Sequence, residues 1–394
     1  MIHVGADVHV RNTYYTATDS EGQRLKSGRC GNNLGEVAEF FAPLERRARA
    51  TGQAVRVVLE STTNSRAMQR LLMRYGQDAG IDLTADVLNA RKLRVIAESV
   101  NKSDKVDSNA LTELSRSNLT LPTCYMPDDD EFALREHLRA RSDLVRMRTM
   151  LKNRVHAVLH RRGIMTPKGD LFAKSGRVFL DQLTLDDAGR TILQRFLSVM
   201  DHIDGAVASS SASLKALMRQ PRWAKPAALL QTMPGVGLIT SLTILAELGN
   251  LGRFRSRAAV ANYAGLVPVS RRSNETHWSG GISRRGSNHL RAVIVEAAWV
   301  AYLRVPVYRD LFDRVQRKKD RRTAIVAVAR RMLEDAFMLL TRDEAFRYAA
   351  PPRMKTSVVI RQVQVSANAA PRVGRSAGVG GSHVGDKAAS SVAG

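Results

Sequence analysis

Cysteine is nearly absent from this chain: Cys30 and Cys124 are the only two among 394 residues. Two thiols supply neither a disulfide framework nor a cysteine-rich zinc site. The first ten residues also lack the basic stretch and the apolar stretch of a secretory signal. No apolar run reaches membrane-spanning length, since even the segment from Ala292 to Leu303 contains Glu296. We therefore expect a soluble, cytoplasmic protein without membrane contact.

Aromatic residues are also scarce, at 5%, whereas basic residues are in large excess. Lysine and arginine number 61 against 37 acidic residues, which gives a formal net charge of +24 and a pI of about 10.8. This imbalance favours a polyanionic partner, because phosphate contacts release counterions. With few rings for base stacking, charge and shape should dominate nucleic-acid binding. The composition also leaves open a basic protein that associates with ribosomes.

The pattern of residues 1–125 is typical of an α/β layer fold. Three strand patterns between residues 2 and 28 precede a helix pattern over 34–50, whose apolar residues share one face. A β-branched run follows at 54–59, of the type found in buried parallel strands. The remaining expected elements are helices near 67–75 and 90–98 and a strand near 81–87. This order predicts a domain in which helices cover a sheet.

Residues 126–223 have the pattern of a helical, coiled-coil-like spacer. Two amphipathic patterns at 128–162 and 188–218 predict long helices, joined by a loop at 163–185. Together they predict a hairpin that forms either a dimerising arm or a simple packing contact with neighbouring domains.

Residues 224–350 predict a third, mostly α domain. It contains Pro234-Gly235-Val236-Gly237 followed by an apolar helix pattern, which is similar to the turn of helix-hairpin-helix DNA-binding modules. Gly235 and Gly237 would let backbone N–H groups approach a phosphate. A plain helix connection is the alternative. Residues 351–394 lose periodicity and become rich in Gly, Ser and Ala, which predicts a disordered tail.

Four acidic residues form the most informative pattern. Asp7 lies in the first strand and Glu60 ends a later one, whereas Asp104 and Asp107 have helical i, i+3 spacing. Strand ends and helix starts meet at one edge of an α/β layer, so the four carboxylates should converge. Mg²⁺ would relieve their repulsion, and two ions about 4 Å apart are suited to phosphodiester chemistry. Taken singly, a non-functional role is favoured: a helix N-cap for Asp104, a solvated surface acid for Asp107 and a strand-end acid in water for Glu60. Gly5 predicts space for a ligand near the backbone.

A second candidate site is an expected loop at 269–286 that is rich in hydroxyl groups, glycines and guanidinium groups. Guanidinium groups suit phosphate oxygens, and a serine among them could attack phosphorus. Composition alone favours passive phosphate binding over nucleophilic catalysis. The candidate residues are Arg271, Arg272, Ser273, Ser279, Ser283, Arg284 and Arg285.

In their order along residues 3–340, these motifs resemble the DEDD transposases of the insertion sequence 110 family. The shared elements are Gly-x-Asp, a strand-end Glu, Lys-Ser-Asp-x-x-Asp beginning at Lys102, a helical spacer, Pro-Gly-Val-Gly, and the Ala-Gly-Leu-x-Pro block with its serines. The resemblance implies an N-terminal domain of RuvC-like, ribonuclease-H type. It also implies that Mg²⁺ binds to Asp7, Glu60, Asp104 and Asp107, and that Lys102 lies near nucleic acid.

The resemblance implies further properties of the C-terminal domain and of the assembly. A serine of the transposase domain would bond covalently to cleaved DNA; its position points to Ser273, with Ser279 and Ser283 as rivals. Family members are guided by an RNA from the element itself, which pairs with donor and target DNA, and they form dimers and tetramers. A place on the bacterial nucleoid would follow.

Two other functions fit the same residues. A hydrolytic, Mg²⁺-dependent nuclease of resolvase type would use the acids to activate water and would form no protein–DNA adduct. A non-catalytic nucleic-acid-binding protein would bind without cleaving.

Overall fold

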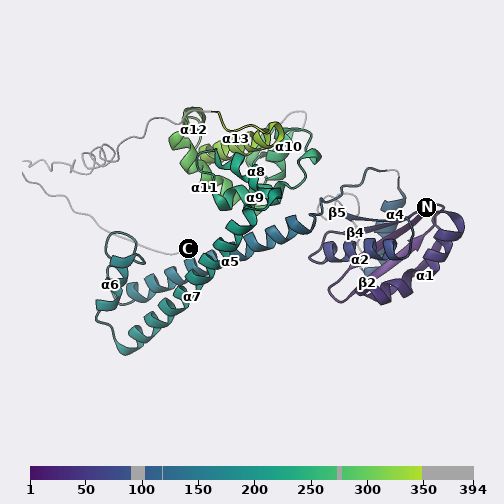
Figure 1. Ribbon diagram of the computed structural model, residues 1–394, viewed down its shortest axis with the longest axis horizontal. Helices are drawn as coiled ribbons and strands as arrows, with labels where there is room; N and C mark the ends of the chain where they lie inside the picture. The colour runs from purple at the N-terminus through teal and green to yellow at the C-terminus, as the bar shows by residue number, and fades with distance from the viewer. Residues whose placement is uncertain (90–102, 118, 273–276, 348–394) are drawn as a thin grey trace, which may run out of the picture. The chain divides into compact units, whose positions relative to one another are not determined.

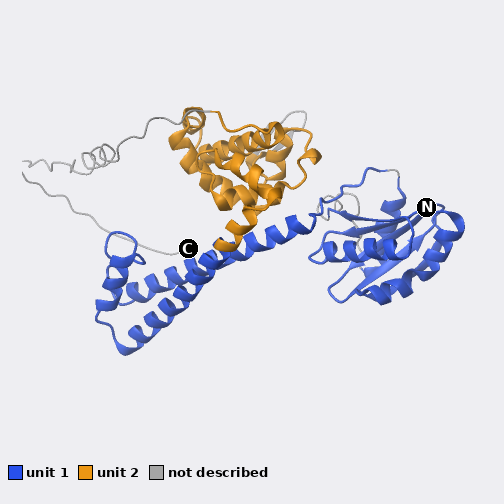
Figure 2. Cartoon of the chain, in the orientation of Figure 1, with its two compact units in different colours: residues 1–211 blue, residues 212–394 orange. Residues whose placement is uncertain are grey.

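The chain divides into two compact units, Met1–Ser211 and Ala212–Gly394 (Figure 2). The computed structural model describes residues 1–89, 103–117, 119–272 and 277–347. The expected helix at 90–98 and the expected tail at 351–394 lie outside these described residues. The four-domain division made from the sequence stays a prediction.

A five-stranded mixed sheet forms the N-terminal layer of the first unit (Figure 1). Its strands are β1 (Ile2–Val8), β2 (Asn12–Thr18), β3 (Arg24–Gly31), β4 (Val55–Glu60) and β5 (Leu83–Leu88). They lie in the order β3-β2-β1-β4-β5, with the first three antiparallel and β1, β4 and β5 parallel. The predicted α/β architecture is therefore confirmed, and it is consistent with a ribonuclease-H-type domain.

One face of the sheet is apolar. Ile2, Val4 and Ala6 of β1 are fully buried in a core that also contains side chains of α1 (Leu34–Thr51) and α2 (Ser65–Asp78). The helix expected at 34–50 is present, and Asn33 caps it by accepting a hydrogen bond from the backbone of Glu36. The apolar face expected for this helix is buried: Val37, Phe40, Phe41 and Leu44.

The other face of β1 is polar and is covered by α4 (Asp104–Arg116). Thr112 Oγ1 accepts a hydrogen bond from the backbone N–H of Gly5 (3.0 Å) and donates to the carbonyl of Thr16 (2.9 Å). The hydroxyl groups of Thr16 and Ser108 are 2.8 Å apart. Directional hydrogen bonds therefore set where α4 lies along the sheet. We call this set the polar seam: His3, Gly5, Thr16, Ser108, Thr112 and Ser115.

The rest of the first unit contains the long helix α5 (Asp129–His160) and most of a second long helix, α7 (Asp187–Met218), whose residues from Ala212 onward belong to the second unit. They run side by side, because Arg148 reaches Asp204 at 3.1 Å and Arg141 reaches Ser211 at 2.9 Å. The two helices and the hairpin that the sequence predicts are thus present. The expected loop at 163–185 is partly wrong, because it contains the short helix α6 (Lys174–Gln182), whose Leu180 is fully buried. A dimerising role for these helices stays a prediction.

The second unit is mostly helical, as expected. Its glycine-rich segment is a surprise, because residues expected to be a loop form a two-stranded antiparallel hairpin. No helix among the described residues is both long and apolar enough to cross a membrane. The elements are α8 (Pro221–Gln231), α9 (Leu238–Leu248), α10 (Arg257–Tyr263), β6 (Pro268–Arg272), β7 (His277–Ile282), α11 (Asn288–Arg304), α12 (Pro306–Gln316) and α13 (Arg321–Arg342).

Candidate metal centre

Two of the four acids lie at the ends of neighbouring parallel strands. The ladder between β1 and β4 runs as far as the pair Ala6 and Leu59, so Asp7 and Glu60 are the next residues on each strand. Residues that face each other in a parallel ladder point to the same side of the sheet, with the strands about 4.8 Å apart. Both residues are partly buried. The strand register therefore brings Asp7 and Glu60 to the same edge and the same face.

The other two acids lie in the first turn of α4. The cap of this helix is Ser103, whose Oγ accepts from the backbone N–H of Val106 at 3.3 Å. The alternative interpretation of Asp104 as the cap is therefore wrong. Neither Asp104 nor Asp107 is the N-cap of the helix. Both carboxylates lie in its first turn, where the helix dipole favours negative charge.

Gly5 has a different role from the one that the sequence suggested. A Cβ atom at this position would lie 2.0 Å from the carbonyl oxygen of Ser108 and 2.5 Å from the backbone nitrogen of Thr112. The space beside Gly5 is therefore filled by α4 and is not open to a ligand. The missing side chain allows the helix to approach the strand closely, and this approach brings Asp104 to Asp7.

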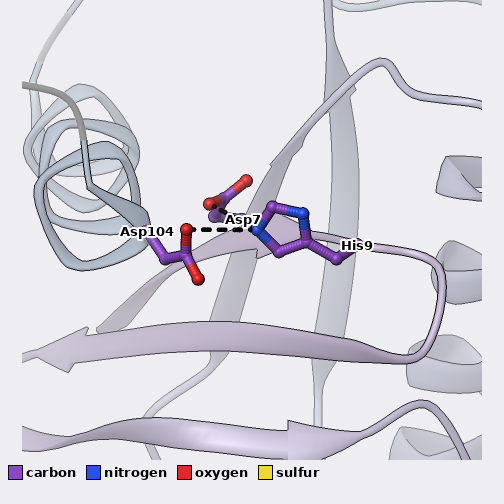
Figure 3. A group of neighbouring side chains, drawn as sticks. All are labelled: Asp7, His9 and Asp104. Carbon is purple, nitrogen blue, oxygen red and sulfur yellow. Dashed lines mark ion pairs between the residues drawn. The ribbon is translucent and has the colours of Figure 1, made fainter.

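A histidine that the sequence did not single out lies between two of the acids. His9 Nε2 is 3.2 Å from Asp7 Oδ2 and 3.3 Å from Asp104 Oδ1, and both carboxylates face the ring (Figure 3). One ligand atom from each of the three residues lies within 4.8 Å of the others. Among the described residues this is the one group of acids, histidines or cysteines compact enough to hold a metal ion.

The electrostatics of the two acids differ. Burial raises the pKa of Asp7, and the nearby charges of Asp104 and Asp107 raise it further, while His9 lowers it. Slight loss of solvent would raise the pKa of Asp104, but His9 and the ion pair with Arg29 outweigh this and hold that pKa below its usual value. A divalent cation would relieve the mutual repulsion, so the donor set fits a hard metal ion.

The structure thus brings Asp7 and Asp104 together directly. Asp107 is close enough to raise the pKa of Asp7, and Glu60 is adjacent by strand register. The signal for His9 was present in the sequence, because a residue two positions after a strand aspartate lies on the same side. Sequence reasoning missed it because only carboxylates were considered as ligands, although the strand expected from the sequence included His9; in the structure β1 ends at Val8, just before it.

The second candidate site falls on the hairpin of β6 and β7. Arg271 and Arg272 lie in β6, and Ser279 lies in β7, opposite Ser270. Ser273 and Lys102 lie outside the described residues.

The residues that follow β7 pack against the Ala-Gly-Leu segment before β6. The backbone N–H of Ser283 donates to the carbonyl of Val267 at 2.8 Å, and that of Arg284 donates to Gly265 at 3.3 Å. Arg284 has a positive φ of 50°. Both Arg284 and Arg285 are exposed, so their guanidinium groups are accessible from solvent.

The two glycines of the α8–α9 turn have different surroundings. A Cβ atom at Gly235 would lie 2.3 Å from the carbonyl oxygen of Ala297, so this glycine allows contact with α11. Gly237 is exposed, has open space around it and is the N-cap of α9. Of the two, Gly237 is the more exposed, because Gly235 is partly buried.

Comparison with known proteins finds two family models that match parts of this chain. A family model for DEDD transposases of the IS110 type matches residues 4–163. A second model, for the transposase IS116/IS110/IS902 family, matches residues 227–313. The first contains the metal-centre residues, and the second contains the β6–β7 hairpin.

Several relatives were found. The y4qE protein of Sinorhizobium fredii is 27% identical over 200 residues, which are 50% of this chain and 47% of that protein. The transposase for insertion sequence element IS1111A of Coxiella burnetii is 24% identical over 318 residues, or 75% of this chain and 80% of that protein. The pilin gene-inverting protein of Moraxella bovis is 30% identical over 123 residues, or 30% and 38%.

The alignments thus span about half of the first relative and four fifths of the second. Two family models, in the expected order, cover both the acidic centre and the hairpin unit. The chain belongs to the DEDD transposases of the IS110 family, which are enzymes that act on DNA.

Proposed function

We propose that this chain is the DNA transposase of an insertion sequence, cutting and rejoining DNA with four metal-binding acids and one serine. The observation that carries the proposal is the closeness of Asp7 and Asp104. Their carboxylate oxygens lie within 4.8 Å of each other, although the two residues come from segments far apart in the chain. A basic chain with net charge +24 supplies the attraction for DNA.

Asp7, Glu60, Asp104 and Asp107 would hold Mg²⁺. When bound, the metal would supply positive charge to a phosphodiester and to the oxygen that leaves it. The chain's own part is to hold the carboxylates in place, and the polar seam does this by fixing α4 on β1. Mg²⁺ prefers oxygen ligands, so His9 would not coordinate the ion and would lie beside the carboxylates that do.

The serine step follows from the family resemblance. Ser273 Oγ would form a bond to phosphorus as the bond from phosphorus to the 3′ oxygen breaks. The hydroxyl proton would leave with solvent or a base, and the 3′ oxygen would leave as a hydroxyl group. The protein would then be linked to the 5′ phosphate, and reversal with a new 3′ hydroxyl would rejoin the strand. Ser279 and Ser283 are the alternative nucleophiles.

Other basic and backbone groups would hold the nucleic acid. Gly237 at the exposed start of α9 would contact a DNA phosphate in the manner of a helix-hairpin-helix module. An RNA of the element would guide target choice, and two or four copies of the chain would assemble around the DNA. The basic contacts proposed are Lys102, Arg271, Arg272, Arg284 and Arg285.

The test is a denaturing gel of purified protein with DNA carrying the element ends, the adjoining RNA and Mg²⁺. Asp104→Asn should abolish strand cleavage and leave salt-sensitive DNA binding largely intact. Glu113→Gln, at the far end of α4, is the matched control and should cleave normally. If Asp104→Asn cleaves at the wild-type rate, the metal-centre assignment is wrong.

The same gel identifies the nucleophile. Wild-type protein should give a slow-migrating covalent adduct, and Ser273→Ala should remove it. An adduct that survives Ser273→Ala but is absent in Ser279→Ala or Ser283→Ala would move the role to that residue. Cleavage without any adduct would favour the hydrolytic nuclease.

A further inference from the structure

A basic pocket of about 860 Å³ lies in the second unit, outside the metal centre. One wall is the base of the β6–β7 hairpin, at Pro268 and Ile282, together with Arg284. The other wall is the end of α12, the turn after it and the first half of α13. Both walls belong to one compact unit.

The rim of this pocket is strongly cationic. The described residues offer no ion-pair partner to five of its basic side chains, all of them exposed. A sixth, Arg330, is paired with Glu334 at 2.9 Å. Positive charges held close together without counter-charges favour an anionic ligand. The five are Arg284, Arg314, Lys318, Lys319 and Arg322.

The single acid of the pocket does not neutralise this rim. Asp320 caps α13, where its carboxylate accepts from the backbone N–H of Thr323 at 2.9 Å and from its hydroxyl at 2.7 Å. These hydrogen bonds lower the pKa of Asp320. Its charge is therefore used to stabilise the first turn of the helix.

The floor of the pocket is apolar, with Leu266, Val315 and Val326 among its residues. An apolar floor below a cationic rim suits a ligand that carries phosphates along its edge and apolar surface between them. A nucleic-acid strand has this distribution, whereas a free small anion would leave the floor uncovered.

We infer that this pocket binds the sugar–phosphate backbone of the DNA strand that is cut, a few nucleotides from the cleaved phosphodiester. The inference rests on the proposed function, since in the sequence Ser273 directly follows Arg272, the last residue of β6, and the first residue of that strand, Pro268, forms part of one wall. A serine that attacks phosphorus needs the strand held near the reacting phosphate, and the pocket lies at the other end of β6, roughly 13 Å of extended strand from Arg272. The occupant is therefore DNA.

The test measures the salt dependence of binding to a fluorescein-labelled 30-base-pair DNA duplex of arbitrary sequence by fluorescence anisotropy. Arg314→Ala combined with Lys318→Ala should weaken binding roughly 10- to 50-fold near 0.15 M salt. The slope of log K against log salt should become shallower by about 0.9 for each DNA phosphate that the variant no longer neutralises. Arg314→Lys combined with Lys318→Arg keeps both charges and should keep the slope.

The matched control is Arg304→Ala combined with Arg342→Ala, two exposed arginines at the ends of α11 and α13 away from the pocket. It should leave the slope near the wild-type value. A pocket variant whose affinity and slope equal those of this control would overturn the inference. So would a loss of affinity seen with an RNA duplex of the same sequence but not with DNA.

Failure of this inference differs from failure of the proposed function. If the pocket variant binds DNA normally while Asp104→Asn still abolishes cleavage, only the assignment of the pocket is wrong. If Asp104→Asn cleaves normally, the proposed function falls whatever the pocket variant does.

Discussion

At the scale of single residues, the lack of a Cβ atom at Gly5 allows α4 to pack closely on β1, and the candidate metal centre depends on this packing. The sequence suggested a glycine that leaves space for a ligand, but α4 fills that space. Sequence alone could not distinguish the two, because a glycine in a strand has the same pattern whether a ligand or another backbone approaches it.

Gly5→Ala should therefore destabilise the first unit by about 1–3 kcal/mol, because the new methyl group would meet backbone atoms that cannot move aside. Cleavage should fall together with stability, since α4 carries Asp104. The measurement is the thermal unfolding midpoint, followed by circular dichroism, alongside the cleavage assay.

Gly205→Ala is the matched control. This glycine lies in α7 with open space around it, so alanine should stabilise by roughly 0.5–1 kcal/mol. Equal midpoints for the two alanine variants would contradict the account of the α4 packing.

His9 gives a second prediction at this scale. As an imidazole beside two carboxylates, it offers a nitrogen where Mg²⁺ prefers oxygen. His9→Gln should therefore keep cleavage within a few-fold of wild type at saturating Mg²⁺, whereas Asp7→Asn should abolish it. The comparison is the initial cleavage rate over a Mg²⁺ titration. A loss with His9→Gln as complete as that with Asp7→Asn would make His9 a required ligand.

At the scale of elements, the sequence predicted the strands of the sheet and the long helices more accurately than the short or polar elements. The opening strands and α1 have clear apolar periodicity, and they lie close to their expected bounds. Helix α6 and the β6–β7 hairpin were missed, because each is short and rich in polar residues. The acids themselves could be named, but their meeting depends on the strand register and the polar seam, which only the folded chain determines.

One contact between elements carries a pH prediction. Arg162, just after α5, binds Asp186 in a two-pronged pair with distances of 2.5 and 3.0 Å, and Asp186 also accepts from the backbone N–H of Gly189 in α7. The Arg162 hydrogen bonds, with a smaller contribution from Gly189, lower the pKa of Asp186 to about 2.

A carboxyl group with a lowered pKa stabilises the folded state above its unfolded pKa of about 3.9, and this contribution is lost as the pH falls toward 2. Asp186→Asn should therefore lower the unfolding midpoint at pH 6 and have a shrinking effect between pH 4 and pH 2. Arg162→Gln should show the same trend, and the double variant should add little to either. A difference from wild type that stays constant over this range would rule out the ion pair as its cause.

At the scale of the whole molecule, self-association is a prediction that the long helices make testable. The middle of α5 exposes large apolar side chains, with Met147 49% and Met150 58% accessible. Met147→Lys combined with Met150→Lys should reduce the assembled state, as measured by light scattering after size exclusion. Met165→Lys, in a loop and 90% exposed, is the control and should leave the mass unchanged. If both variants keep the wild-type mass, this face does not join copies of the chain.

The position of Asp7 and Asp104 in the chain also bears on when the metal centre is formed. β1 is the first element of the sheet layer to be synthesised and α4 is the last, yet the two are in contact. Contacts between distant segments form late in folding because a long loop must close first. A nascent or partly folded chain therefore carries Asp7 without Asp104 beside it. In this fold the acidic centre is present only after the sheet layer is complete, so an unfinished chain lacks the assembled centre to which we assign DNA cleavage.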